Sequence, residues 1–221
     1  MDIKFSAEDV AFRNEVKGFF AAEYDGAAST RLGSDPAADY KSDIVAWQKK
    51  LHAKGWIAPG WPKEYGGTGW TSTQKFIYET ERGLAGIPDV VPFGLKMVAP
   101  VIYTFGTEEQ KQEFLPKISR GEIWWCQVFS EPGAGSDLAN ILTSAVLSKG
   151  TYTIEGSKIW TSEANKADWM YCLVRTDKTV KKQAGISFIL IDLKQPNVDI
   201  KPIQLLSGQS PFCQVFFDNI L

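Results

Sequence analysis

The spacing of apolar residues changes near Gly121, and this change constrains the fold more than any other feature of the sequence. Before it, apolar residues such as Val16 and Phe20 recur every three or four positions, as on the buried face of an α-helix. After it, they form short runs, rich in β-branched and aromatic side chains, that end at Gly, Asn, Asp or Pro. The sequence therefore predicts an α+β fold, with an all-helical domain at 1–120 and a β domain at 121–221.

Local signals divide the helical half into elements. Ser6 with Asp9, and Thr107 with Gln110, have the spacing of helix-starting capping boxes, and Gly55 stands where a helix would end. The expected elements are helices at about 6–24, 36–54, 73–85 and 107–119, a turn-rich segment at 59–67 and a buried apolar segment at 93–105.

The β half contains short runs typical of strands. They lie at 124–129, 143–147, 152–154, 169–175, 186–193, 198–205 and 213–217. Lys149 and Gly150 fit the tight turn of a hairpin. Because no helical pattern separates these runs, we expect an antiparallel sheet that closes into a barrel-like or sandwich arrangement.

Composition excludes several kinds of partner. The net charge is −2 and Lys and Arg are scattered among Asp and Glu, so no basic face is available for a nucleic acid. The longest strongly apolar run, 186–191, is far shorter than the roughly 20 residues that a membrane helix needs. The first residues, 1–9, lack the pattern of a signal peptide. We therefore expect a cytoplasmic protein with no membrane partner.

The few histidines and cysteines limit the chemistry further. His52 is the only histidine, and it lies in a Lys-rich helical stretch with no nearby serine or cysteine nucleophile, so we interpret it as a helix-end residue. Cys126, Cys172 and Cys213 are odd in number and widely spaced, which favours neither disulfides nor a zinc site. They are expected to be small buried side chains, and no metal site is predicted.

The first candidate site is the glycine-rich segment 127–137, which follows a predicted strand. Such a loop can bring backbone N–H groups close to an anion or a planar heterocycle. It is not a dinucleotide-binding fingerprint, because Leu138 stands in place of the third glycine, and no Gly-Lys-Ser/Thr ends it. The pattern alone leaves open a purely structural turn, which is the more frequent use of a Gly-Ala-Gly sequence.

The second candidate is the segment 156–168, in which Trp160 is followed by Thr161 and Ser162. An aromatic face with hydroxyl groups beside it would suit a flat ligand such as a flavin. The alternative that the residues leave open is a tryptophan at a strand end that covers the core of the barrel.

Together, these segments resemble the flavin-binding signature of the acyl-CoA dehydrogenase family. The resemblance lies in the Ser-Glu-Pro-Gly-Ala-Gly-Ser-Asp run at 130–137 and the Gly-x-Lys-x-Trp-Thr-Ser run at 156–162. It extends over nearly the whole chain, through similar stretches at 61–67, 105–111, 167–168, 173–176 and 216–219. Within the family, the chain looks most similar to large subunits of bacterial heteromeric enzymes, such as pimeloyl-CoA dehydrogenase or enzymes that act on CoA-linked steroid side chains.

The resemblance implies an activity and a cofactor. Family members oxidise an acyl-CoA to the trans-2-enoyl-CoA: a carboxylate removes the α-proton while the β-hydrogen leaves as hydride to FAD. The residues that would bind FAD are Gln127, Phe129, Ser130, Gly135, Ser136, Trp160, Thr161 and Ser162. Ser136 is also expected to contact the CoA moiety.

The resemblance also implies that the catalytic base lies outside this chain. In the family, a glutamate of a C-terminal helical bundle is the base, and that domain would begin beyond Leu221. No catalytic residue is therefore predicted among these 221 residues, and the fragment alone should be inactive. The implied partners are an acyl-CoA substrate, an electron-transferring flavoprotein and other subunits of a homo- or hetero-oligomer. An oxidase and a flavin-free partner subunit of the same fold remain open alternatives.

Overall fold

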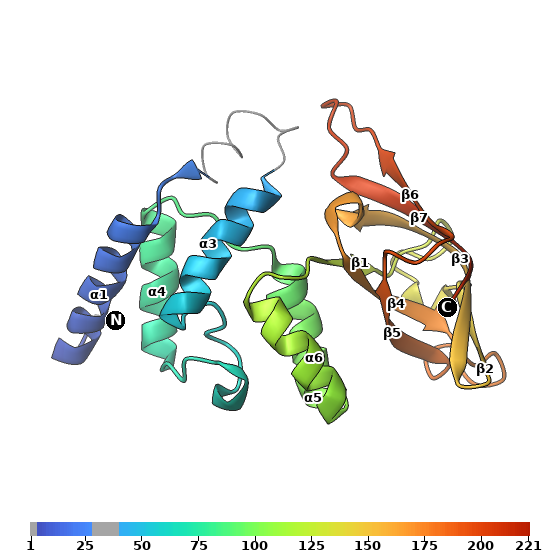
Figure 1. Cartoon of the computed structure of the whole chain (residues 1–221), viewed down its shortest axis with the longest axis horizontal. Coiled ribbons are helices and arrows are strands. Elements are labelled where there is room, and N and C mark those ends of the chain that lie inside the picture. The colour runs from blue at the N-terminus through green and yellow to red at the C-terminus, as the bar shows by residue number, and fades with distance from the viewer. Residues whose placement is uncertain (1–3, 28–39) are drawn as a thin grey trace. The chain divides into compact units, whose positions relative to one another are not determined.

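The computed structural model describes residues 4–27 and 40–221, which fall into two compact units, Met1–Glu122 and Ile123–Leu221 (Figure 1). The first unit is helical and the second is a curled sheet, so the predicted α+β fold is confirmed. The helical unit contains α1 (Ala7–Glu23), α3 (Lys41–Lys54), the 3-10 turn η1 (Lys63–Tyr65), α4 (Ser72–Leu84), the π-helical turn η2 (Phe93–Val98), α5 (Ala99–Phe105) and α6 (Glu108–Ser119). Of the helix predicted at 36–54, residues 36–39 lie outside the described residues.

The predicted caps begin and end these helices. Ser6 Oγ accepts a hydrogen bond from the Asp9 N–H at 3.1 Å before α1. Thr107 Oγ1 accepts one from the Gln110 N–H at 3.3 Å before α6. Gly55 ends α3 in the left-handed conformation, with φ of 76°. These contacts satisfy backbone groups that a helix leaves without partners, and they involve only residues close in sequence.

Aromatic side chains build the core of the helical unit. The ring of Phe20 on α1 lies 6.1 Å from that of Trp47 on α3 and 5.4 Å from that of Tyr78 on α4. His52 lies in the last turn of α3, as expected of a helix-end residue. None of the helices in the described ranges has the length and apolar character needed to cross a membrane.

The segment 93–105 is helical and only partly buried. Leu95 and Val98 lie in the core, but Phe105 is 81% exposed. The prediction of a buried segment is therefore wrong at its C-terminal end, because the helical period turns one face of α5 outward.

The second unit is a seven-stranded sheet. Its strands are β1 (Trp125–Val128), β2 (Ser144–Ser148), β3 (Thr151–Ser162), β4 (Trp169–Arg175), β5 (Ile186–Asp192), β6 (Val198–Ile203) and β7 (Phe212–Ile220). They lie in the order β1-β4-β2-β3-β7-β6, and β5 also pairs with β4. The turn between β2 and β3 has positive φ at Lys149 and Gly150, as the predicted hairpin requires.

Two pairings depart from the antiparallel arrangement that we expected: β2 meets β4 in parallel at Ser144 and Arg175, and β1 pairs with β4 over a longer stretch. β1 runs parallel to β4, from Trp125 opposite Trp169 to Val128 opposite Cys172. Parallel neighbours need a crossover connection, and here the chain that contains β2 and β3 provides it. The sheet is therefore mixed, although most of its neighbours are antiparallel.

β3 is much longer than the predicted run at 152–154. Two irregularities hide it in the sequence: Gly156, with φ of 145°, and a register shift between Lys158 and Thr161. A Cβ atom at Gly156 would lie 2.6 Å from Thr143 Oγ1, so this close approach of two strands requires glycine. The register shift is a β-bulge, and bulges re-aim side chains.

The core of the β unit includes the three cysteines. Cys126, Cys172 and Cys213 are all buried and free, which confirms the prediction for them. Burial raises the pKa of Cys126, and burial raises the pKa of Cys172 to about 12. These groups are therefore inert thiols at neutral pH.

Candidate functional site

The two sequence segments singled out above lie side by side in the β unit. The backbone N–H of Ile159, in β3, donates a hydrogen bond of 2.9 Å to the carbonyl of Ser130, just after β1. The tertiary structure thus joins two motifs that the sequence separates, and the residues that they carry belong to one region.

A buried lysine strengthens this connection. Lys158, in β3, is 0% exposed. Its Nζ donates hydrogen bonds to the carbonyls of Phe129, at 3.1 Å, and Leu173, at 2.6 Å. It also forms an ion pair with Glu131 Oε1 at 2.9 Å. Lys158 therefore links β3 to the end of β1, to the glycine loop and to β4.

The carboxylate of Glu131 is held from a second side. It accepts hydrogen bonds from the backbone N–H groups of Leu142, at 2.6 Å, and Thr143, at 3.0 Å. Burial alone would raise the pKa of Glu131, but these hydrogen bonds and the charge of Lys158 outweigh it and hold the pKa below its usual range. Glu131 is therefore an anion that serves as an anchor.

An aromatic cluster surrounds the end of β1. The Tyr171 hydroxyl donates a hydrogen bond to Gln127 Oε1 at 3.1 Å. The Tyr171 ring stacks on Phe188 at 5.4 Å, and Phe129 packs edge-on against Tyr171 at 5.7 Å. Burial raises the pKa of Tyr171, so its hydroxyl stays protonated and remains a donor. Gln127 and Phe129 are thus fixed in orientation.

The glycine loop is tight at its start and open along its backbone. Glu131 and Ala134 exchange two backbone hydrogen bonds of 3.0 Å. A Cβ atom added at Gly133 or Gly135 would meet nothing within 4 Å, and Ser136 is exposed. A ligand could therefore approach the loop backbone closely. Beside the loop lies a cavity of about 380 Å³, lined by Glu131, Pro132, Gly133, Asn140, Leu142, Thr143, Gly156 and Ser157.

The residues after Lys158 point in different directions. Trp160 has φ of 60° at the bulge and is 55% exposed, with its ring edge-on to Phe212 at 6.2 Å. A tryptophan that covers the barrel core would be buried, so that alternative is wrong. Ser162 is half-buried. Thr161 is buried, and its Oγ1 has no hydrogen-bond partner among the residues that the structure describes.

These observations fit a flat cofactor with an anionic tail. An exposed indole beside half-buried polar groups suits a ring, and an open glycine backbone suits a phosphate. Thr161 fits least well, because its hydroxyl is buried. The residues that sequence reasoning missed are Glu131, Tyr171 and Lys158. Lys158 lies in a stretch of mixed polar and apolar residues, so the sequence carried no clear signal for it, and the irregular course of β3 hid the strand.

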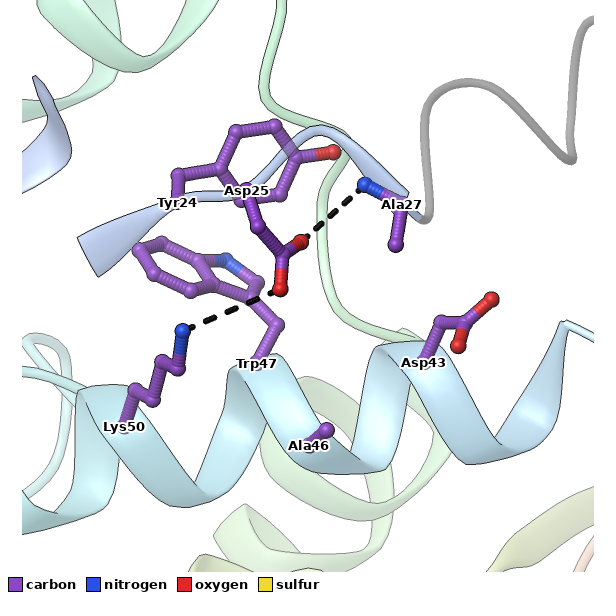
Figure 2. A pocket seen from close by; sticks show the side chains of 7 residues that line it. All are labelled: Tyr24, Asp25, Ala27, Asp43, Ala46, Trp47 and Lys50. Atoms are coloured by element: carbon purple, nitrogen blue, oxygen red, sulfur yellow. Dashed lines mark hydrogen bonds and ion pairs between the residues drawn. The ribbon is translucent and has the colours of Figure 1, made fainter.

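Two hollows in the helical unit have different characters. A cavity of about 460 Å³ is lined mainly by apolar groups, including Trp61, Tyr78, Leu95 and Tyr103. A cavity of about 40 Å³ holds no more than a few water molecules. Figure 2 shows its lining, in which Lys50 on α3 faces Asp25 at 3.9 Å. Across residues 4–27 and 40–221, no cluster of His, Cys, Asp or Glu suited to a metal ion is found.

Comparison with protein families identifies the class of protein to which the helical unit and the curled sheet belong. Residues 6–122 match "Acyl-CoA dehydrogenase, N-terminal domain", and residues 126–220 match "Acyl-CoA dehydrogenase, middle domain". The chain therefore belongs to the acyl-CoA dehydrogenase family, whose members are flavoproteins.

Two individual relatives show how similar this chain is to members of the family and how much of their length it covers. Acyl-CoA dehydrogenase IpdE1 of Mycobacterium tuberculosis is 39% identical over 213 residues, which cover 94% of this chain and 55% of that protein. Acyl-CoA dehydrogenase FadE34 of the same organism is 43% identical over 175 residues, which cover 78% of this chain and 24% of that protein. The chain thus spans about half the length of IpdE1 and a quarter of FadE34.

Solved structures include a complex of two different proteins. The ChsE4-ChsE5 complex from Mycobacterium tuberculosis matches with a TM-score of 0.82 and 33% identity, over 100% of this chain and 55% of that chain. The Tcur3481-Tcur3483 steroid ACAD matches with a TM-score of 0.82 and 34% identity, over 100% of this chain and 56% of that chain. The expected similarity to subunits of bacterial heteromeric enzymes is confirmed.

Proposed function

We propose that the protein containing this chain binds FAD and oxidises an acyl-CoA thioester to the trans-2-enoyl-CoA. The observation that carries the proposal is the junction between the two motif segments, in which Lys158 Nζ donates to the Phe129 carbonyl at 3.1 Å. Through it, Phe129 and the exposed indole of Trp160 belong to one site. Membership of a flavoprotein family supports the same conclusion.

Each part of the site has a proposed role. Gln127, Phe129 and Ser130 would lie along the flavin, and Trp160 would pack on its ring with Thr161 and Ser162 beside it. Gly135 and Ser136 would approach the pyrophosphate or the CoA moiety through the open loop. Bound FAD would supply the acceptor for the hydride. The chain's own residues orient that ring and shield it from water.

The general base is proposed to come from outside this chain. A base near neutral pH needs a carboxylate with a raised pKa, whereas the pKa of Glu131 is lowered by its hydrogen bonds and by Lys158. Glu131 is therefore unsuited to remove an α-proton. The relatives are longer than this chain, which leaves room for a base in a further helical domain.

The similarity to a steroid ACAD favours a CoA thioester of a steroid-derived acid as the substrate. We also propose that the protein assembles with a second, different subunit, as the ChsE4-ChsE5 complex suggests, and passes electrons to an electron-transferring flavoprotein. The cytoplasmic location stays a prediction.

The same complex favours one alternative, a flavin-free subunit that keeps the fold and completes the site of a partner. One experiment distinguishes the two functions. The full-length protein, expressed with and without a candidate partner subunit, is reconstituted with FAD, and its flavin absorbance is recorded. We expect bound flavin that acyl-CoA bleaches under anaerobic conditions. A folded, colourless protein in both preparations would sink the proposed function.

The 221-residue chain alone is expected to be inactive and to bind FAD weakly. Without a general base, the rate should fall by a factor of roughly 10² to 10⁴. Anaerobic mixing of the chain, FAD and a panel of acyl-CoA esters should leave the flavin oxidised. Bleaching at an enzymatic rate would show that the base lies within these residues.

A further inference from the structure

We propose that the buried ion pair between Lys158 and Glu131 is the positioning element of the flavin site, which holds the glycine loop and the two motif segments in register. This inference rests on the proposed function, because FAD is the ligand for which the site is positioned. Both side chains are buried and their polar atoms bond to other residues of the β unit, so we assign both as positioning residues.

Lys158 uses its whole hydrogen-bonding capacity inside the β unit. A lysine ammonium group has three protons. Three acceptors surround Nζ: the carbonyls of Phe129 and Leu173 and the carboxylate of Glu131, at 3.1, 2.6 and 2.9 Å. Two of the acceptors lie where β1 runs into the glycine loop and the third lies in β4, so one side chain links these parts of the chain to β3.

Glu131 extends these contacts to the start of β2. Its two carboxylate oxygens accept the N–H groups of Leu142 and Thr143, while its backbone closes the turn with Ala134. The loop between Glu131 and Leu142 is therefore fixed at both ends by one carboxylate. Its middle, with Gly133 and Gly135, stays open to a ligand.

The pair also sets the place of the exposed tryptophan. Lys158 is anchored inward, Ile159 bonds to the Ser130 carbonyl, and the bulge then turns Trp160 outward. The two sides of the proposed flavin site are Ser130 and Trp160. Ser130 is next to Glu131 in the sequence, and Trp160 is two residues from Lys158, so the ion pair lies close to both.

Burial is what makes this pair unusual. Lys201 and Asp199 in β6 form an ion pair of the same length, 2.9 Å, but both side chains are more than half exposed. An exposed pair contributes little, whereas removing one partner of a buried pair leaves an uncompensated charge in the interior. Buried ionic groups seldom add stability over an apolar core, and their best-attested use is to fix one arrangement of neighbouring segments.

The test compares the full-length wild-type protein with Glu131→Gln, which keeps the side-chain shape and removes the charge. Lys158→Met/Glu131→Met, which removes both charges, serves if the single variant does not fold. Lys201→Met is the exposed-pair control. Ile191→Ala, in the core of the same sheet, is a control for lost stability. Two readouts are used: hydrogen exchange of the FAD-free protein and FAD affinity.

We expect faster exchange at Leu142, Thr143 and Ile159 in the ion-pair variants. We also expect weaker FAD binding by about ten- to hundredfold, which corresponds to the loss of a hydrogen bond to a charged group. Lys201→Met should match the wild type in both readouts. Ile191→Ala should retain FAD affinity while its thermal midpoint falls.

Two results would overturn the inference. One is unchanged exchange at these amides in both ion-pair variants. The other is a loss of FAD affinity in Ile191→Ala as large as in Glu131→Gln, since the ion pair would then contribute stability alone. A wild-type protein that binds no FAD would overturn the proposed function, and the exchange readout would still decide whether the pair holds the loop.

Discussion

The helical unit and the β unit each bury a carboxylate, but they neutralise it differently. Glu81 on α4 is buried, and its partners on α1, Arg13 at 2.5 Å and Lys17 at 4.0 Å, are partly exposed to water. Lys158 and Glu131 in the β unit are both buried. If the buried charge of Glu81 is removed, its partners can still be hydrated, whereas removing either charge of the Lys158–Glu131 pair leaves the other buried without a partner. The helical unit should therefore tolerate changes that the β unit does not.

The sharpest test of this difference removes one charge from each pair. We expect Lys158→Met to destabilise the β unit by about 3–5 kcal/mol, because Glu131 would remain buried and ionised. Glu81→Gln should cost only about 1 kcal/mol or less, because Arg13 and Lys17 can still be hydrated. Chemical unfolding of both variants, followed by circular dichroism, measures the two free energies. Equal losses would break the comparison between the units.

Substitutions of two tryptophans in the β unit should affect FAD affinity and folding stability differently. Trp160 is exposed, so Trp160→Ala should leave the unfolding free energy nearly unchanged and weaken FAD binding by about 1 kcal/mol beyond lost burial, the value of one aromatic contact. Trp124 is buried, so Trp124→Ala should lower stability by about 3–5 kcal/mol. FAD titration and thermal unfolding of each variant measure these effects. Equal FAD affinity in Trp160→Ala and the wild type would count against the proposed site.

A helix cap tests the helical unit alone. Thr107→Ala removes the side chain that accepts the Gln110 N–H, and we expect a loss of about 1 kcal/mol in stability. Because this cap lies in the helical unit, FAD affinity should stay at the wild-type value. Gln112→Ala, at an exposed position of the same helix, is a control for the helix surface. A drop in FAD affinity in Thr107→Ala would show that the two units are coupled.

The smallest expected effect is a pH dependence confined to the β unit. The folded-state pKa of Glu131 is lowered, so its contribution to stability is complete above the unfolded pKa of about 4.3 and is lost as the pH falls through the folded pKa. Urea midpoints between neutral and acid pH should show this loss. In Glu131→Gln, this part of the dependence should be absent; an identical pH profile in both proteins would mean that the pair does not hold the carboxylate.

Much of the helical unit could be predicted from sequence because its signals are local. The capping boxes at Ser6 and Thr107 and the end of α3 at Gly55 depend on contacts within a few residues. In the β unit, the Lys149-Gly150 turn is equally local, and it was predicted for the same reason. The motif residues were recognised through a family resemblance rather than through their contacts.

Contacts between segments that are distant in the sequence were decided only by the tertiary structure. The parallel pairing of β1 with β4, the exposure of Trp160 and the partners of Lys158 all depend on strand order and register. A strand is predicted from the alternation of buried and exposed side chains along the sequence. A bulge, or a glycine such as Gly156, breaks this alternation and hides the strand. The sequence alone therefore determined most of the elements, though not the length of β3, and its family resemblance identified the motif residues. Only the folded chain shows that Lys158 connects the two motif segments. A buried charge requires polar partners, and for Lys158 these come from segments that are distant in the sequence.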